Sequence, residues 1–437
     1  MGLNLSGTGN TGLAGTSSRS RAYPWAVTAL VLGLLLSDYM SRQVLSAVFP
    51  QLKAAWTLSD AQLGSLSGVV ALMVGILTMP LSLLADRWGR ARSIALMAVV
   101  WSVATLGCAF AANYGQMLTA RFFVGVGEAA YGSVGLAVIM SVFPPKVRAT
   151  LAGAFTSAGI FGAVLGTALG GSIAAHYGWR EAFLAMAAFG LVVTAVYCLT
   201  VTEGRLARHA HQSAAVRTGT GTGLSVGETL RAVFGSRALI CAYFGGGLQS
   251  FALYSLLAWM PSYLNRYYGM APGKAAMSAA GMFILSGVGM TLCGVLTDWA
   301  GRGAPARKVS FGIGFCLLSC VVLSIAFRLP AGNAQIILIA LGALVAAGPW
   351  GPAGASVANL ANPVVHATAL AILALAYNLM GAAPGPFLTG VLADRIGLLG
   401  ALQLAQLVSI PAALAFMLCR RTYLRDLPDA ARSGDNV

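Results

Sequence analysis

The chain has 437 residues, of which 58% are hydrophobic and 9% charged, and its mean hydropathy is +0.79. Because soluble domains carry about 25% charged residues, this composition excludes a soluble globular protein and indicates a polytopic membrane protein. The net charge of +15 does not indicate a nucleic-acid partner, because the Lys and Arg residues gather in alternate loops, as in the cytoplasmic loops of membrane proteins.

Twelve apolar segments are long enough to cross a bilayer, which takes about 20 helical residues. They show no period-two alternation, so a membrane β-barrel is excluded. An even number of spans puts both termini on one side, and the basic loops indicate that this side is the cytoplasm. We therefore expect an all-α, multi-pass protein of a bacterial inner membrane. The predicted spans are 25–49, 60–84, 93–112, 116–142, 150–174, 182–201, 238–260, 275–297, 309–328, 334–358, 367–391 and 399–418.

A long polar segment after the sixth span divides the membrane region into two halves. The Gly/Ser/Thr-rich N-terminus is too polar to pack a core and predicts disorder. The expected organisation is a disordered cytoplasmic tail (1–24), a first six-helix bundle (25–201), a cytoplasmic linker (202–237), a second six-helix bundle (238–419) and a cytoplasmic C-terminal tail (420–437).

A short charged motif after the second span recurs in the second half. Residues 82–90 read S-L-L-A-D-R-W-G-R, and residues 294–302, after the eighth span, read G-V-L-T-D-W-A-G-R. A fainter pair joins residues 171–178, at the end of the fifth span, to residues 390–397, at the end of the eleventh. Two matches in equivalent places predict a pair of six-helix bundles related as parallel repeats.

The motif after the second span resembles the signature loop of the major facilitator superfamily, with Ser82 where that family usually has glycine. The resemblance implies two pseudo-symmetric six-helix bundles that alternate access to a site between them. In such a fold the charged loops can hold the bundles together on one side and release them during turnover. The alternative is that the arginines only fix membrane orientation. The residues expected to form this cytoplasmic gate are Asp86, Arg87, Arg90, Asp298 and Arg302.

Four ionisable residues lie at membrane depth in the first half, and none in the second. A charged side chain at membrane depth costs about 2.5–3.5 kcal/mol on insertion scales, so the presence of each of these four residues suggests a function. Asp38 and Arg42 share one face of the first span, and Arg121 and Glu128 share one face of the fourth. We expect Glu128 to carry a proton, with Asp38 as the second candidate. Arg42 is either the partner of Glu128 or a contact for a negative group of the substrate, and Arg121 is a further candidate for substrate binding. A static network of buried salt bridges that orients the helices is the alternative.

Two segments are similar to the spinster-like branch of the superfamily, which transports lipids and lysolipids. They are D-Y-M-S-R at 38–42 and R-F-F-V-G-V-G-E-A-A-Y-G-S at 121–133, which includes the candidate substrate residue Tyr131. The resemblance implies that Arg42 and Glu128 take part in coupling. The acid at Asp38 departs from the branch, which more often has it at the place of Ser41. The organic-anion and sugar-acid symporters keep a similar arginine and glutamate, so the substrate class stays open.

Glycine and proline interrupt the seventh, tenth and eleventh spans, and such interruptions often face a cavity in transporters. They can equally be packing kinks. Polar and aromatic side chains beside them are candidate substrate contacts, namely Gln249, Tyr254, Trp350, Tyr377 and Asn378.

These features favour a monomeric secondary transporter that works by alternating access, with the lipid bilayer, protons and a small, anionic or lysolipid solute as partners. We expect no cofactor, no metal site and no enzymatic activity, because we find neither a His-rich cluster nor a nucleophile elbow, and G-T-G-T-G at 219–223 lacks the Lys-Ser/Thr of a phosphate-binding loop. A lysolipid-type uniporter, a channel and a non-transport membrane protein are the alternatives. Symport and antiport use the same residues, so the direction is left open.

Overall fold

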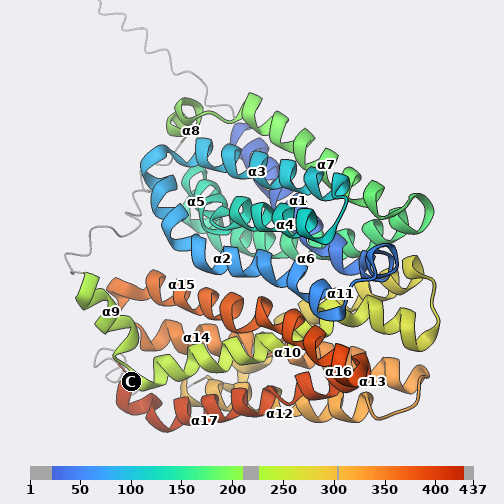
Figure 1. Cartoon of the computed structure of the whole chain (residues 1–437). Coiled ribbons are helices and arrows are strands. Elements are labelled where there is room, and N and C mark those ends of the chain that lie inside the picture. The colour runs from blue at the N-terminus through green and yellow to red at the C-terminus, as the bar shows by residue number, and fades with distance from the viewer. Residues whose placement is uncertain (1–21, 210–225, 303–304, 428–437) are drawn as a thin grey trace, which may run out of the picture.

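The computed structural model describes residues 22–209, 226–302 and 305–427, and throughout these ranges the regular elements are helices. Figure 1 shows them as two stacked bundles of long helices, the first half of the chain above the second. The predicted N-terminal tail up to residue 21, the middle of the linker and the last ten residues of the C-terminal tail lie outside the described residues.

The first bundle contains the first six spans. They are α1 (Ala22–Trp56), α2 (Asp60–Trp88), α3 (Arg90–Phe110), α4 (Tyr114–Glu128) with α5 (Tyr131–Val142), α6 (Arg148–Tyr177) after the short η1 (Pro145–Val147), and α7 (Trp179–Thr200). α4 and α5 form one span that is interrupted at its centre. The described parts of the linker form α8 (Glu203–His209) and α9 (Val226–Phe234).

The second bundle repeats this arrangement. Its helices are α10 (Arg237–Tyr268), α11 (Pro272–Ala300), α12 (Pro305–Ala326), α13 (Asn333–Ala346) with α14 (Trp350–Leu360), η3 (Pro363–Val365), α15 (His366–Ala376) with the π-helix η4 (Tyr377–Ala382) and α16 (Pro384–Gln406), and α17 (Ser409–Asp426).

Length and apolarity identify 11 stretches among the described residues that could cross a membrane. The last of them, 366–426, has 61 residues, so it would be about 90 Å long at 1.5 Å per residue, far beyond a hydrocarbon core of about 30 Å. Gly397 breaks its helical backbone with φ 79° and ψ 157°, a conformation that favours glycine. The stretch is therefore two spans, and the predicted twelve-helix fold is confirmed.

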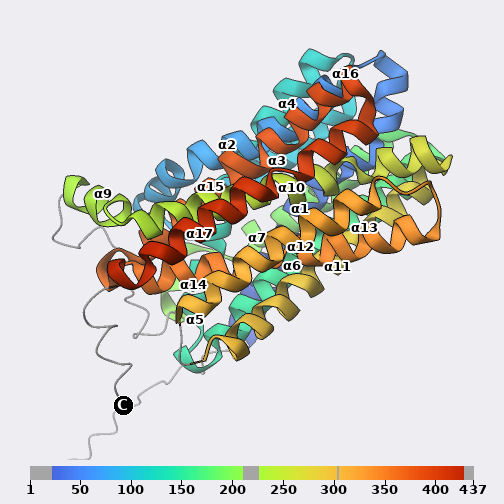
Figure 2. The ribbon, with the colours of Figure 1, turned by 90° about the horizontal axis from the view of Figure 1, so that it is seen from below.

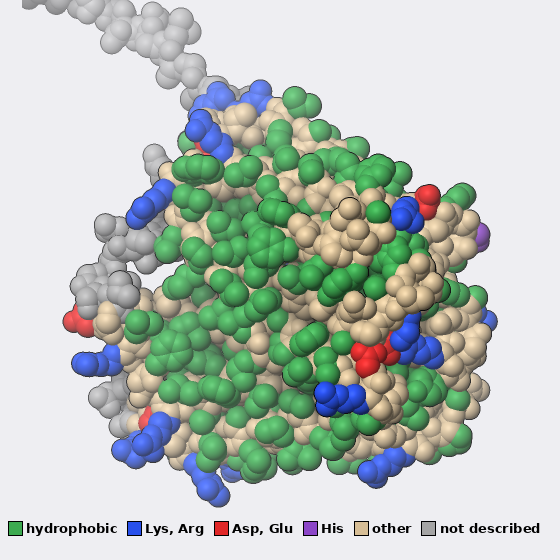
Figure 3. Space-filling model, in the orientation of Figure 1, with side chains coloured by type: hydrophobic (Ala, Val, Ile, Leu, Met, Phe, Trp, Pro, Cys, Tyr) green, Lys and Arg blue, Asp and Glu red, His purple; other side chains and the backbone are tan. Residues whose placement is uncertain are grey.

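The two ends of the bundles differ in how the halves meet. In Figures 1 and 2, α9 lies at the left-hand end of the helices and α16 toward the right-hand end. We call these the linker end and the far end. Figure 3 shows a broad apolar surface between them, with many of the visible Lys and Arg side chains at the linker end.

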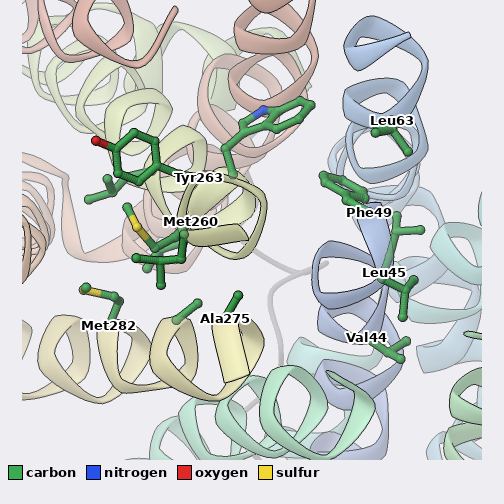
Figure 4. Packing of buried hydrophobic residues seen from close by; sticks show 14 of the residues in the cluster. Val44, Leu45, Phe49, Leu63, Met260, Tyr263, Ala275 and Met282 are labelled. Atoms are coloured by element: carbon green, nitrogen blue, oxygen red, sulfur yellow. The ribbon is translucent and has the colours of Figure 1, made fainter. Parts of the chain in front are cut away.

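At the far end, one apolar cluster joins both bundles. Figure 4 shows Val44, Leu45 and Phe49 of α1 opposite Met260 and Tyr263 of α10. At the linker end, each bundle has a core of its own. Close packing of apolar side chains therefore joins the bundles at the far end and not at the linker end.

Glycines let α6 pack closely on α1. A Cβ added to Gly162 would lie 2.7 Å from the carbonyl oxygen of Leu36, and one added to Gly166 would lie 2.6 Å from the carbonyl oxygen of Met40. Small residues at such positions are what bring membrane helices into contact, since lipid gives no hydrophobic drive between them. α1 and α6 therefore form one tightly packed pair.

Gly166→Ala is expected to lower the free energy of unfolding by about 1–3 kcal/mol, the usual cost of overpacking a tight contact. Gly153 is the matched control on the same helix, because a Cβ there meets nothing within 4 Å. Gly153→Ala is expected to be neutral or slightly stabilising, since alanine is the better helix former. Denaturation of the purified variants in detergent measures both changes. Equal effects at the two positions would contradict close packing of α6 on α1.

Candidate functional site

An ion cluster joins the middle of α1 to the end of α4. The Nε of Arg42 donates a hydrogen bond to Oδ1 of Asp38 at 3.1 Å and lies 2.7 Å from Oε2 of Glu128. The hydroxyl of Ser41 donates to Oε1 of Glu128 at 3.1 Å. Asp38 and Glu128 are 3% and 2% exposed, whereas the Arg42 side chain keeps 21% exposure. Arg42 is thus the accessible member, with two buried carboxylates sharing it.

Glu128 reaches α1 because α4 packs closely on its neighbours. A Cβ on Gly125 would lie 2.8 Å from the carbonyl oxygen of Val70 in α2, and one on Gly127 would lie 2.6 Å from the amide nitrogen of Trp101 in α3. The helix stops directly after Glu128, and the hydroxyl of Thr78 donates to the carbonyl oxygen of Ala129 at 2.5 Å. The interruption therefore leaves this carbonyl paired inside the membrane, as lipid requires.

Arg121 and Tyr131 lie behind the ion cluster. Arg121 is 1% exposed and donates to the carbonyl oxygens of Ser41 at 2.8 Å, Arg42 at 3.4 Å and Leu66 at 3.4 Å. Tyr131 is fully buried, and its hydroxyl donates to the carbonyl oxygen of Val31 at 2.5 Å. Because main-chain carbonyls occupy these donors, the contacts favour a role in positioning α1 over direct contact with a substrate.

Three predicted residues of the second bundle form an aromatic wall, which we define as Tyr254, Trp350 and Tyr377. The rings of Trp350 and Tyr377 are stacked, with centroids 4.8 Å apart and planes 7° apart, and the Tyr254 ring lies 6.3 Å from Trp350. Trp350 packs against the apolar cluster that joins the bundles, and so does Tyr39 of α1, whose ring centre lies 5.5 Å from Arg42. The aromatic wall therefore lies at the interface between the bundles, on the side of the second bundle.

The other two predicted residues of the second bundle have different surroundings. The amide of Gln249 is buried and donates to the hydroxyl of Ser319 at 3.3 Å and to the carbonyl oxygen of Ala346 at 3.1 Å, so it ties α10 to α12 and α13. Asn378 is partly exposed and donates to the carbonyl oxygen of Ala374 in its own turn at 2.9 Å.

The predicted cytoplasmic gate residues lie at the linker end. Asp86 accepts hydrogen bonds from Arg90 at 3.2 Å, and Asp298 forms an ion pair with Lys308 at 2.6 Å. Arg87 and Arg302 are exposed. These ion pairs lie within one bundle each, so the gate stays a prediction for another conformation.

Glu203 of α8 was not recognised in the sequence. Its carboxylate accepts hydrogen bonds from the amides of Ala91 at 2.7 Å and Arg92 at 3.2 Å, and so caps the first turn of α3. The charged loop is thereby fixed to its own bundle.

The far end carries an ionic contact between the bundles that the sequence analysis also missed. Asp60, the first residue of α2, accepts two hydrogen bonds from Arg266 of α10 at 2.7 and 2.6 Å and pairs with Lys53 at 2.5 Å. Asp394 of α16 accepts from the amides of Asp60 at 2.7 Å and Ala61 at 2.9 Å, where a helix N-terminus favours an anion. We call these four side chains, Lys53, Asp60, Arg266 and Asp394, the far-end latch.

Two grooves lie away from the ion cluster. One of about 850 Å³, with a mainly apolar lining, lies between α3 and α4. The other, of about 340 Å³, lies between α6 and α11 at the seam of the two bundles, beside Ile160 and Gly287. Neither is lined by a residue of the ion cluster or of the aromatic wall.

The sequence and fold both match known transporters. The chain is 26% identical over 323 residues to a "Probable L-galactonate transporter" of Escherichia coli (strain K12), covering 73% of this chain and 71% of that one. It is 25% identical over 390 residues to "Protein spinster homolog 1" of Xenopus laevis, covering 85% and 73%.

Among solved structures, a bacterial homolog of the human lysosomal transporter spinster, in an inward-facing and unoccupied conformation, has the same fold. Its TM-score is 0.83 at 22% identity, with 94% of this chain and 99% of that chain covered. The sequence profile of the Major Facilitator Superfamily matches residues 31–383, which is most of the chain. The protein therefore belongs to the Major Facilitator Superfamily and is a secondary transporter.

Proposed function

We propose that the protein is a proton-coupled carrier of a small organic anion in a bacterial inner membrane, with its linker end in the cytoplasm. The orientation is supported by the basic loops, which the positive-inside rule assigns to the cytoplasm. The substrate class is supported by Arg42, the partly exposed cation of the ion cluster. Similarity to a protein named as a galactonate transporter agrees with an anionic solute.

The observation that carries proton coupling is that two buried carboxylates share Arg42. With Asp38 and Glu128 ionised, their charges balance those of Arg42 and Arg121. An anion that docks on Arg42 then adds a negative charge in a poorly hydrated site, which is costly. A proton on Glu128 removes that excess, so anion binding and protonation favour each other.

Alternating access follows from the unequal ends of the molecule. The far-end latch and the shared apolar cluster close the far end, so the ion cluster is reached from the linker end in this conformation. In the opposite conformation the far-end latch separates, and the loops that carry Asp86 and Asp298 approach the other bundle.

The test is uptake of radiolabelled acids into proteoliposomes with and without an imposed proton gradient. Sugar acids, aromatic acids and lysophospholipids are compared as substrates. Accumulation of an acid against its own gradient, only when the proton gradient is present, is the expected result. Equal flux with and without the gradient for every solute would exclude proton coupling.

Arg42→Lys is expected to raise the KM of uptake about tenfold, or about 1.4 kcal/mol, with a smaller effect on the maximal rate. Lysine keeps the charge but loses the planar fork that binds a carboxylate and pairs with two acids at once. Arg92→Lys is the matched control, since Arg92 is exposed in the first turn of α3 at the linker end. An unchanged KM in Arg42→Lys would remove Arg42 from substrate binding.

A second candidate function, facilitated movement of a lysolipid, is favoured by the groove between α6 and α11. Its position at the seam gives an acyl chain a lateral approach from the bilayer. Gradient-independent movement of lysophospholipid, with no uptake of small acids, would select this function.

A further inference from the structure

We propose that the carried anion is an aromatic carboxylate, with its carboxylate on Arg42 and its ring against the aromatic wall. This inference rests on the proposed function, because it names the substrate of the same site.

Two of the three rings of the wall lie at interruptions of helical segments, and Tyr254 lies inside α10. Trp350 begins α14 directly after the break that follows α13, and Tyr377 begins the π-helix η4. Gly246 of α10 makes room for Tyr377, because a Cβ there would lie 2.8 Å from Cε1 of the tyrosine ring. Local π-helical turns often occur at functional sites. The stacked pair therefore results from irregular backbone rather than from regular helix packing.

The wall is accessible, unlike most large aromatic side chains nearby. Tyr254, Trp350 and Tyr377 are all partly exposed, whereas Trp259 and Tyr263 on the same helix as Tyr254 are 0% and 1% exposed. The partly exposed faces of these three rings are free to stack on a ligand. Aromatic rings prefer offset-stacked or edge-to-face partners.

A positive charge lies at one end of this accessible surface. Arg42 keeps 21% side-chain exposure and lies 5.5 Å from the centre of the Tyr39 ring, and Tyr39 and Trp350 both pack against the apolar cluster that joins the bundles. An aromatic carboxylate presents a charge and a flat ring a few ångströms apart. The carboxylate matches the positive charge of Arg42, and the ring matches the aromatic wall.

The amide donors beside the wall are occupied, whereas the Oε1 of Gln249 has no partner among the described residues. The Nε2 of Gln249 and the Nδ2 of Asn378 are both bonded to protein acceptors. A site that selects a sugar acid needs unpaired donors and acceptors for several hydroxyls. The indole N–H of Trp350, by contrast, is buried without a partner among the described residues, so it can donate to one ring substituent. A ring with a single hydroxyl fits this arrangement.

The test is equilibrium binding of radiolabelled 4-hydroxybenzoate to the purified full chain, with cyclohexanecarboxylate and gluconate as competitors. Cyclohexanecarboxylate has a six-membered ring and a carboxylate but no π face. We expect 4-hydroxybenzoate to bind at least tenfold more tightly than either competitor. Equal or tighter binding of gluconate would overturn the proposal.

Trp350→Leu separates stacking from a general loss of structure. It is expected to weaken binding of 4-hydroxybenzoate at least tenfold and to change binding of cyclohexanecarboxylate less than threefold. Tyr377→Phe keeps the stacked ring and is expected to keep most of the affinity. Trp299→Leu is the matched control, since Trp299 is 65% exposed on the surface of α11. An equal loss for both ligands in Trp350→Leu would contradict stacking.

Uptake assays distinguish failure of this inference from failure of the proposed function. Proton-driven accumulation of gluconate but not of 4-hydroxybenzoate would overturn the inference and leave the function in place. Tight, Trp350-dependent binding of 4-hydroxybenzoate with no proton-driven uptake of any acid would leave the substrate class in place and overturn coupling.

Discussion

Glu128→Gln is expected to abolish proton-driven accumulation while preserving exchange of labelled for unlabelled solute. A gradient of one pH unit stores about 1.4 kcal/mol per proton, enough for about a tenfold concentration ratio in one-to-one symport. Glutamine cannot release a proton, and it resembles the protonated acid in shape and charge. The variant should therefore bind and exchange the anion, but the ratio of the anion concentrations inside and outside the proteoliposomes should stay at about one. Proteoliposomes with an imposed pH gradient measure both activities.

Glu181→Gln is the matched control, because Glu181 is exposed at the start of α7. Asp38→Asn tests the second candidate, since Asp38 also pairs with Arg42. Full proton-driven accumulation in Glu128→Gln would remove Glu128 from coupling. If Asp38→Asn alone lost accumulation, Asp38 would be the proton carrier instead.

Asp60→Asn is expected to shift the protein toward the conformation that is open at the far end. The substitution leaves Arg266 and Lys53 without their carboxylate and removes two charge-assisted hydrogen bonds. Hydrogen bonds to charged groups contribute about 1.5–3 kcal/mol each, and every 1.4 kcal/mol is about a tenfold change in an equilibrium. A rise of at least about tenfold in the far-open population is therefore expected.

The shift can be measured as the distance between spin labels at Ala54 and Arg395, which lie in opposite bundles and are exposed. The exposed Cys198 is replaced first. Lys274→Gln is the control, because Lys274 is exposed on α11 at the same end. Asp394→Asn should act in the same direction but more weakly, since an asparagine oxygen still accepts from the helix N-terminus. An unaltered distance distribution in Asp60→Asn would show that the far-end latch does not hold this conformation.

Much of the fold could be predicted because lipid permits few solutions. Continuous apolar runs identify the spans, and the recurrence of the charged motif predicts the two bundles. Helix ends were less predictable. The first span was expected at 25–49, but α1 continues to Trp56 through Pro50 and Lys53, because a helix can extend past the hydrocarbon with its backbone bonds intact. Likewise, the last span was expected to end at 418, and α17 continues to Asp426.

The candidate site was predictable where the information is local. The spacing of Asp38 and Arg42 predicts one helix face, and the two side chains are hydrogen bonded. The acceptors of Arg121 are main-chain carbonyls, which leave no signal in the sequence. The far-end latch joins residues of opposite bundles, so no local spacing could reveal it. The match between residues 171–178 and 390–397, which include Asp394, was the one available signal, and it was interpreted only as a trace of duplication.

The unequal distribution of charge between the bundles has an evolutionary consequence. All four ionisable side chains at membrane depth belong to the first bundle, while the aromatic wall belongs to the second. Under the proposed function, substitutions in the second bundle can alter which solute is accepted without disturbing the proposed proton-carrying residues of the first. A lineage with this division of labour can diversify its nutrients or exported metabolites while inheriting an unchanged energy source.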